Sequence, residues 1–487
     1  MRRSVLVALS VVGMGGIAAA NGRPAATSTI NFEQGSPQHI AAGMTFGFLR
    51  SDNGGTTWKW MCEATVGYGG TYDPDYAYSP TGALFATTFD GLKVNRDGCS
   101  FNSAPSGNTF VSSVQMGPTG NVFFAAADPA DGKIYKSPDD GAMFPTSASP
   151  GQNNDWWDSL MVAPSDKTHV YVTGYRFNKT CNAAAANAGE TCKADFNCGT
   201  NAGAMCEAVK QFLMFKSVDG GASYSPMSIT GLTTSNLSAI DVVGVNHKHP
   251  DELYIRINLE NGELGDSIYK SRDAGATWHK ILTTTDSLGL SFLIRSDGTL
   301  VAGTQSSGSM RSANGAACLS QATCNWIPLT GAPHINCLVE NPANHDVWAC
   351  THNFASTTIP GDGYGIMKST DLSSWSGVLR YQDIAGVVTC EASTIQAAQC
   401  VASFEGKPSV WCCLEQQLGI TDRSVDCTGA AQCQSPADAG VAAVKPPAVV
   451  EDKKPTAKPK GCCDVGGSGR GSLLLALGTA LLLRRRR

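Results

Sequence analysis

The sequence predicts an all-β fold assembled from about seven copies of one structural unit. Only 16% of the 487 residues are charged whereas 53 are glycine, so the chain is poor in charge and rich in turns. An octapeptide pattern returns along the chain, and a strand–turn–strand pattern alternates with it. This composition and this periodicity favour a secreted β protein over a helical cytosolic enzyme.

The octapeptide reads Ser, any residue, Asp or Asn, any residue, Gly, any residue, Ser or Thr, aromatic. Four copies are complete or depart at one position: 51–58, 137–144, 217–224 and 271–278. Three are degenerate: 95–101, 312–326 and 369–375. The third residue is expected to accept hydrogen bonds from turn N–H groups, and the glycine to supply a positive φ. A structural role is therefore predicted for the third residue of each copy: Asn53, Asp97, Asp139, Asp219, Asp273, Asn314 and Asp371.

The second pattern is an apolar strand, a turn of Pro, Gly, Asp or Asn, and another apolar strand. Residues 78–86 and 116–123 are examples. Each unit then contains four strands, with the octapeptide between the third and the fourth. Successive octapeptides begin 41 to 80 residues apart, and ~40–50 residues make one four-stranded propeller blade. The longest interval contains a cysteine-rich insertion, residues 179–209.

These octapeptides resemble the Asp-box (BNR) repeats of sialidases and sortilin-like propellers. The resemblance implies a single seven-bladed β-propeller over residues 28–386. Six or eight blades are the alternatives, because three copies are degenerate. The first and the last unit each hold four strands of their own, so the sequence does not indicate how the ring closes.

In propellers of this kind the Asp-box turns lie on one rim, and the loops of the opposite face bind ligands. The loops expected on that face bring together aromatic and charged residues that could contact a ligand: Tyr68, Tyr72, Trp156, Trp157, Asp158 and Arg176. Exposed aromatic rings stack on sugar faces or apolar ligands. The alternative is that both tryptophans pack at the base of the fourth blade.

The resemblance to sialidases implies an arginine triad whose first member lies in a Phe/Tyr-Arg-Ile-Pro motif. Among the predicted mature residues before the first box region only Arg23, in Gly22-Arg23-Pro24, is of that type, because Arg50 belongs to the box itself. Arg176, Arg256 and Arg295 are scattered. No catalytic residue is therefore assigned. The leading prediction is a binding module for a glycan or protein ligand, without cofactor or metal. The alternatives are a glycoside hydrolase of the sialidase or xyloglucanase type and a structural or adhesive envelope protein.

The two ends of the chain resemble targeting segments. Residues 1–20 combine Arg2 and Arg3 with a short apolar run and Ala18–Ala20, as a signal peptide does. The segment 461–487 places Cys462 and Cys463 before a short apolar stretch and four terminal arginines. It resembles the MYXO-CTERM sorting tail of myxobacterial surface proteins. That resemblance implies a bacterial protein processed by a protease at Cys462 or Cys463, possible lipidation there, and display at the cell surface or outer membrane, with part of it extracellular.

Between the body and this tail, residues 434–460 consist mainly of Ala, Pro, Lys and Val and are expected to form a semi-extended stalk. The apolar stretch of the tail is too short to be a stable transmembrane span. The predicted mature body, after loss of both ends, has 29 cations and 40 anions, a net charge of −11. A nucleic-acid partner is excluded on that ground, and a monomer is expected.

The chain has 18 cysteines, which export would pair as disulfides. They fall in local groups, for which the sequence suggests Cys62–Cys99, Cys318–Cys324 and Cys337–Cys350. Four more lie in the insertion and six in a module over residues 387–433, whose pairings stay open. A zinc site is the rival interpretation for these cysteines, and export disfavours it.

Overall fold

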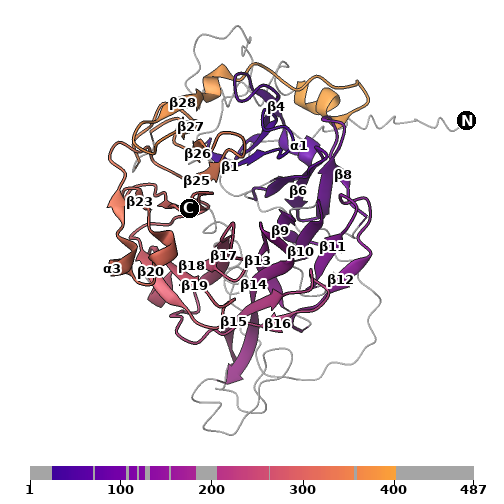
Figure 1. Ribbon diagram of the computed structural model, residues 1–487. Helices are drawn as coiled ribbons and strands as arrows, with labels where there is room; N and C mark the ends of the chain where they lie inside the picture. Colours follow the sequence, from indigo (N-terminus) through magenta and orange to yellow (C-terminus); the bar gives the residue numbers. More distant parts are fainter. Residues whose placement is uncertain are drawn as a thin grey trace, which may run out of the picture.

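The computed structural model describes residues 25–69, 72–105, 109–117, 120–126, 132–152, 155–181, 206–262, 264–355 and 359–401. The predicted signal peptide, the stalk, the sorting tail and most of the insertion lie outside these residues. Figure 1 shows the described chain as sheets arranged radially around a common axis. There are seven four-stranded antiparallel sheets in this part of the chain, which confirms a seven-bladed β-propeller.

Every blade is built from four consecutive strands that pair in chain order. Blades 1 to 4 consist of β1 (Thr27–Phe32), β2 (Ile40–Met44), β3 (Gly47–Ser51) and β4 (Lys59–Met61); β5 (Tyr76–Tyr78), β6 (Leu84–Thr88), β7 (Gly91–Asn95) and β8 (Asn102–Ser103); β9 (Val111–Met116), β10 (Val122–Ala126), β11 (Ile134–Ser137) and β12 (Thr146–Ala148); and β13 (Trp156–Ala163), β14 (Asp166–Cys181), β15 (Cys206–Ser217) and β16 (Ser225–Pro226). Blades 5 to 7 consist of β17 (Ala239–Val245), β18 (Leu253–Asn258), β19 (Asp266–Ser271) and β20 (His279–Thr283); β21 (Phe292–Ile294), β22 (Leu300–Ala302), β23 (Met310–Ser312) and β24 (Ile327–Pro328); and β25 (Cys337–Glu340), β26 (Val347–Cys350), β27 (Ile366–Ser369) and β28 (Ser376–Leu379).

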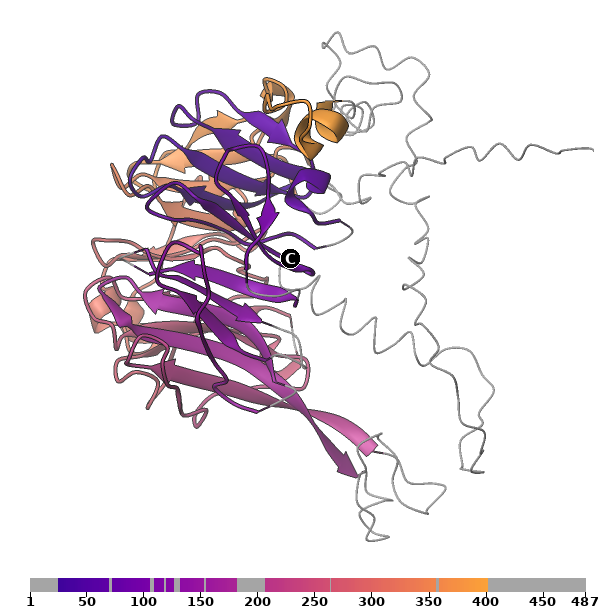
Figure 2. The ribbon, with the colours of Figure 1, turned by 90° about the vertical axis from the view of Figure 1, so that its right-hand side faces the viewer.

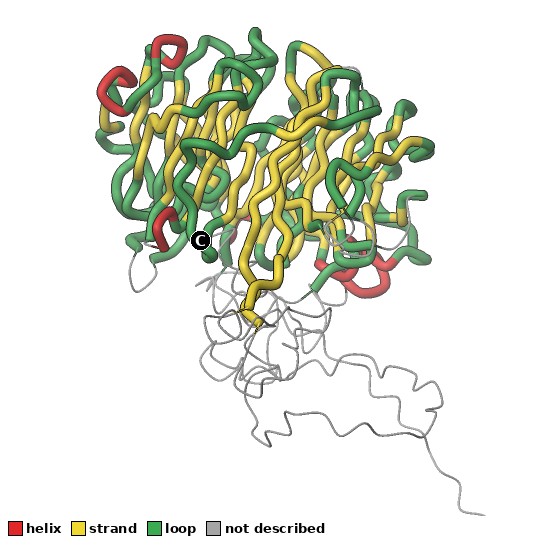
Figure 3. The backbone as a smooth tube through the Cα atoms, turned by 90° about the horizontal axis from the view of Figure 1, so that it is seen from below, coloured by secondary structure: helices red, strands yellow, loops and turns green. Residues whose placement is uncertain are grey.

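The helices are short and lie in connecting segments (Figure 3): α1 (Glu63–Val66), α3 (Gln321–Cys324), η1 (Glu260–Gly262), η2 (Gly315–Ala317), η3 (Tyr381–Asp383) and η4 (Gln396–Cys400). Within the described residues, none of them combines the length and the apolar character needed to cross a bilayer. The second strand of a blade is apolar without alternation, because neighbouring blades cover both of its faces. All five residues of β6 and of β10 are buried.

Antiparallel pairing places the turns of a blade alternately at its two ends. The turns between first and second strands and those carrying the octapeptides therefore share one face, which we call the octet face. The other face carries the loops between second and third strands and between blades. The hairpin of β14 and β15 projects on that side beyond the rest of the propeller (Figure 2), and we call it the hairpin face.

Each complete octapeptide forms a turn held by two side chains. In blade 5, Asp273 Oδ1 accepts from the backbone N–H of Thr277 (2.8 Å) and from Ser271 Oγ (2.8 Å). Ser271 Oγ in turn accepts from the N–H of Gly275 (2.8 Å). The serine is fully buried, so it is as central to the turn as the aspartate that the sequence pattern emphasises.

The fourth and fifth residues of these turns both have a positive φ. Ala274 has φ 54° and Gly275 has φ 82°, although the sequence pattern leaves the fourth position open to any residue. The fifth position has a second requirement, which is close contact with the preceding blade. A Cβ atom on Gly221 would lie 3.1 Å from the Phe123 ring of blade 3, and one on Gly55 would lie 2.8 Å from the Trp348 ring of blade 7.

The ring in such a contact occupies one defined position of its blade. It lies on the second strand, directly opposite the residue that precedes the octapeptide, as Phe123 lies opposite Lys136. The residues at this position in blades 1 to 7 are Ala41, Phe85, Phe123, Tyr171, Tyr254, Val301 and Trp348. The Lys136 ammonium lies 5.5 Å from the Phe123 ring centre and donates to Gly220 O of blade 4 (2.7 Å). Ring, glycine and lysine thus connect blades 3 and 4, and the close approach of Gly141 to the Phe85 ring connects blades 2 and 3.

The ring closes without a strand shared between its ends. After blade 7 the chain runs along β4 of blade 1, where Trp60 N–H donates to Gly386 O (2.8 Å) and Val388 N–H donates to Trp60 O (3.0 Å). Just before this segment, Tyr381 OH lies 2.9 Å from Thr27 Oγ1 of β1. We call residues 384–400 the closing segment.

Two disulfides fasten the closing segment: Cys62–Cys400 and Cys99–Cys390. The predicted pair Cys62–Cys99 is therefore wrong, and Cys390 and Cys400 do not pair within the predicted tail module. The local pairs Cys318–Cys324 and Cys337–Cys350 are confirmed. The sequence grouping failed because neighbouring cysteines on blades 1 and 2 each have a closer partner in a segment about 300 residues further along the chain.

Candidate functional site

The hairpin face carries an aromatic surface at blade 4. Trp156, at the start of β13, pairs directly with Tyr175 on β14, and their rings are stacked with centres 6.2 Å apart. Phe177, two residues further along β14, packs edge-on against Tyr175 at 5.3 Å and is 45% exposed. Cross-strand pairing and the two-residue strand period place the three rings on the same face of the blade. We call Trp156, Tyr175 and Phe177 the Trp156 surface.

A buried lysine supports this surface from blade 4. The Lys210 ammonium lies 4.2 Å from the centre of the Tyr175 ring and donates to Ser238 O of blade 5. Burial lowers the pKa of Lys210, while the negative charges of Asp158 and Asp241 act in the opposite direction. The cation fixes the Tyr175 ring against blade 5, so the Trp156 surface presents preorganised aromatic faces.

A second aromatic cluster lies on the same face at blades 2 and 3. The Tyr72 ring packs against Phe89 (4.7 Å) and Phe110 (5.6 Å), and its hydroxyl lies 2.6 Å from Thr87 Oγ1. Phe89 is 47% exposed. Sequence reasoning named Tyr72 but missed Phe89 and Phe110. A phenylalanine in the two-residue loop between β6 and β7, where polar residues are usual, was the available signal.

The other residues predicted for this face have structural contacts. Trp157 is fully buried and donates to Gly132 O of blade 3 (2.9 Å), whereas Trp156 is only partly buried, so the interpretation that both tryptophans are packed holds for Trp157 alone. Tyr68 is buried and donates to Met44 O and Gly47 O. Arg176 forms two hydrogen bonds with buried Asp155, at 2.7 and 2.8 Å. The structure thus brings Trp156 and Asp158 together near Lys210, whereas Tyr68 and Trp157 belong to the core.

The three scattered arginines do not converge. Arg256 is buried in blade 5 and pairs with Asp241 at 2.6 Å, and Arg295 lies in an octet-face turn with Glu340 at 3.3 Å. Arg176 is likewise paired with Asp155, so each of the three guanidinium groups already contacts a carboxylate of the protein. A substrate carboxylate held by three arginines is therefore not an arrangement that these residues offer.

Blades 6 and 7 contribute a histidine–carboxylate pair to the hairpin face. His334 Nδ1 lies 2.8 Å from Asp362 Oδ1, and the His334 and His352 rings meet edge-on at 6.3 Å. Burial lowers the pKa of His352, against the raising effect of Asp362. Among the residues that the structure describes, no three His, Cys, Asp or Glu side chains are grouped so that they could hold a metal ion.

No protein-family model matches the sequence, and no curated protein matches it significantly. Solved structures do match. One is YCF48 bound to D1 peptide, at 12% identity and a TM-score of 0.31, with 55% of this chain and 67% of that chain covered.

Two further matches are to longer proteins. The extracellular domain of a putative one-component system from B. thetaiotaomicron is 12% identical with a TM-score of 0.45, covering 72% of this chain and 39% of that one. An ancestral GH74 enzyme is 13% identical with a TM-score of 0.43, covering 70% and 46%. This chain therefore spans less than half the length of either protein, and similarity at this level assigns it no function.

Proposed function

We propose that this protein is a binding module whose hairpin face recognises a glycan or a protein ligand. The observation that carries the proposal is the Trp156 surface, with two stacked rings, an exposed third ring and a buried ammonium behind them. A sugar ring presents C–H groups to an aromatic face and hydroxyls to its surroundings. The preorganised rings and the nearby Asp158 carboxylate suit such a ligand, so a glycan is the favoured class.

Phe177 and Trp156 are the residues to test, because they contribute ring area without stabilising the core. The purified protein would be screened on a glycan array and against a peptide library. Phe177→Ala and Trp156→Ala should each weaken binding of any ligand found by roughly tenfold, since each stacked ring contributes about 1 kcal/mol or more. Leu264→Ala is the matched control, because Leu264 is 75% exposed on the same face.

The same ligand distinguishes binding from hydrolysis. A binding module leaves the glycan intact after prolonged incubation. Release of product that is abolished by Asp158→Asn would favour the glycoside hydrolase instead. Retention of full affinity in both aromatic variants would place the ligand elsewhere and contradict the proposal.

We further propose that the protein is exported and displayed at a bacterial cell surface. The signal-peptide pattern of residues 1–20 and the sorting-tail pattern of residues 461–487 support this, and so does a disulfide-bonded propeller. Cell fractionation combined with the intact mass of the surface form tests it. A surface form that still carries Arg484–Arg487 would contradict processing at Cys462 or Cys463.

A further inference from the structure

The joint between blades 1 and 2 lacks the ring–glycine contact that connects blades 3 and 4, as does the joint between blades 6 and 7, where Val301 takes the ring position and Leu372 the turn position. At the ring position blade 1 has Ala41, opposite Arg50, where blades 2, 3, 4, 5 and 7 have an aromatic residue. The octapeptide of blade 2 is one residue short, and within it only Gly98 has a positive φ. This joint therefore lacks the ring, and the glycine of its turn lies against the Arg50 guanidinium instead.

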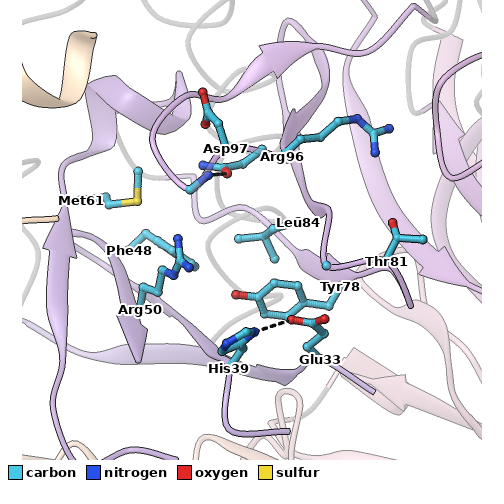
Figure 4. A pocket seen from close by; sticks show the side chains of 13 residues that line it. Glu33, His39, Phe48, Arg50, Met61, Tyr78, Thr81, Leu84, Arg96 and Asp97 are labelled. Carbon is cyan, nitrogen blue, oxygen red and sulfur yellow. Dashed lines mark hydrogen bonds and ion pairs between the residues drawn. The ribbon is translucent and has the colours of Figure 1, made fainter. Parts of the chain in front are cut away.

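A cavity of about 280 Å³ lies at this joint, on the octet face. Figure 4 shows Arg50, Tyr78, Glu33 and His39 among the residues that line it. Small-molecule sites usually measure ~300–1,000 Å³, so a cavity of this size suits a ligand of amino-acid or single-sugar dimensions. Ala41 does not itself line the cavity, but it lies opposite Arg50 in the strand register and shares a buried cluster with Phe48 and Leu84, which do line it.

One wall of the cavity donates hydrogen bonds. Arg50 is oriented by its Nε contact with Asp52 (2.6 Å), and its guanidinium lies against Gly98, where any side chain would collide with Nη1. The Tyr78 hydroxyl faces the same space. Burial raises the pKa of Tyr78 while Arg50 lowers it, with a net increase, so the phenol remains a donor at neutral pH.

The other wall carries a carboxylate. Glu33, in the turn between β1 and β2, accepts from His39 Nδ1 at 2.7 Å, and its side chain is only 10% exposed. Arg96 and Asp97 also line the cavity, but Arg96 pairs with Asp140 (3.0 Å), and Asp97 accepts from the turn N–H groups of Cys99 and Ser100. The cavity thus offers the Arg50 cation with a phenol on one side and the shielded Glu33 carboxylate on the other.

Asp52 engages Nε of Arg50 and His39 engages Oε2 of Glu33, which leaves the terminal nitrogens of Arg50 and Oε1 of Glu33 to contact a ligand. A simple carboxylate would use the first and a simple amine the second, whereas a ligand with both charges would use both.

We propose that this cavity binds a small zwitterion of amino-acid size, with its carboxylate on Arg50 and Tyr78 and its ammonium group on Glu33. Charge-assisted hydrogen bonds at both ends fix the orientation of the ligand. The site lies on the face opposite the Trp156 surface, so it is independent of the function proposed above.

Isothermal titration calorimetry of the purified protein tests the assignment. The probes are glycine, L-alanine and L-serine, with acetate and ethylamine as ligands that carry one of the two charges, and D-glucose as a neutral ligand. At least one amino acid should bind saturably, and acetate, ethylamine and glucose should each bind at least about tenfold more weakly.

Three variants and one control locate the site. Arg50→Gln should weaken amino-acid binding at least about tenfold, and Tyr78→Phe about fivefold. Ala41→Phe restores the ring that other blades carry and should abolish binding. Lys216→Gln is the matched control, because Lys216 occupies in blade 4 the position of Arg50 in blade 1.

Four results would overturn the proposal. They are no heat from any of the three amino acids at up to about 10 mM, equal affinity for acetate, unchanged affinity in Arg50→Gln, and an equal loss in Lys216→Gln. Because Tyr78→Phe removes a single hydroxyl, it gives a readout even where Ala41→Phe does not fold.

Discussion

Blades 3 and 4 and blades 7 and 1 are joined by the same ring contact but in different surroundings. In the first joint Phe123 packs on Gly221, Lys136 reaches across to Gly220, and the chain continues directly from one blade into the next. In the second, Trp348 packs on Gly55, yet no loop connects the two blades. The closing segment and two disulfides replace that loop.

This difference shows what a propeller needs when its last blade takes no strand from its first. Six joints are maintained by chain connectivity, which keeps neighbouring blades close together even when contacts are lost. The seventh has only side-chain contacts, a short ladder along β4, and covalent cross-links. The stability of the closing joint should therefore depend on disulfides more strongly than the stability of the other six joints does.

Removing the cross-link at this joint should give the largest difference in stability between the closing joint and a local cross-link elsewhere. In the double change Cys62→Ser and Cys400→Ser the Cys99–Cys390 bridge stays closed, so the loop that opens is roughly 50 residues long, and chain entropy predicts a loss of about 4 kcal/mol in the free energy of unfolding. The control is Cys318→Ala with Cys324→Ala, which opens a loop of 6 residues and should cost about 2 kcal/mol. Urea denaturation followed by tryptophan fluorescence measures both. Equal losses would show that the closing joint is ordinary.

The two rings give the next effect. Trp348→Ala and Phe123→Ala should each cost about 3–5 kcal/mol, since both rings are fully buried. Trp348 shares a hydrophobic cluster with Cys62 and Cys400, whereas Phe123 belongs to another cluster. In double-mutant cycles with the Cys62/Cys400 variant, Trp348→Ala should therefore couple by about 1 kcal/mol, and Phe123→Ala should add within about 0.5 kcal/mol. If both rings coupled equally to the Cys62/Cys400 change, the ring of Trp348 and the Cys62–Cys400 disulfide would not act together at the closing joint.

The smallest expected effect comes from a change in an octapeptide turn, a feature that all blades share and that does not involve the closing joint. Hydrogen bonds from Ser223 and Ser217 lower the pKa of Asp219 from 3.8 to about 2. Its stabilising contribution is therefore present above pH 3.8 and lost as the pH falls toward 2. Asp219→Asn should lower the melting temperature slightly at pH 7 and not at pH 2, because Asn53 already accepts the equivalent N–H bond in blade 1. A constant difference between pH 7 and pH 2 would show that the charge of Asp219 is irrelevant.

The repeated octapeptide made the blades predictable from the sequence, whereas the joint that closes the ring could not be predicted. Spacing of the octapeptides located all seven third-to-fourth strand turns, because their geometry depends on residues within eight positions of one another. The positive φ of Asp140 and Ala274 was missed, since neither residue type requires it. Cys99–Cys390 was missed for the opposite reason, because local sequence carries no information about a partner 291 residues away.

The hairpin face was predictable as a location but only partly in its residues. The sequence-based prediction gave Trp156 and Trp157 the same role. Adjacent residues of a strand point to opposite faces, however, so only one of the two rings could belong to the exposed surface. Sequence alone could not identify which one, because this depends on the packing of Phe215 and Gly132 around Trp157. The cavity at the first joint was missed because Ala41 is unusual only when aligned by strand register with the rings of other blades.

Contiguous blades have a consequence for how such a chain can change. Because no sheet mixes strands from the two ends, a whole blade is the smallest piece of sequence whose duplication or deletion leaves every sheet intact. The close approach of Thr27 and Tyr381 also means that a short peptide could link the end of the last blade to the first strand of the propeller, with new termini opened between two other blades. A chain permuted in this way would keep the same seven sheets in a different order along the sequence. The disulfides of the closing segment, by contrast, join it specifically to blades 1 and 2.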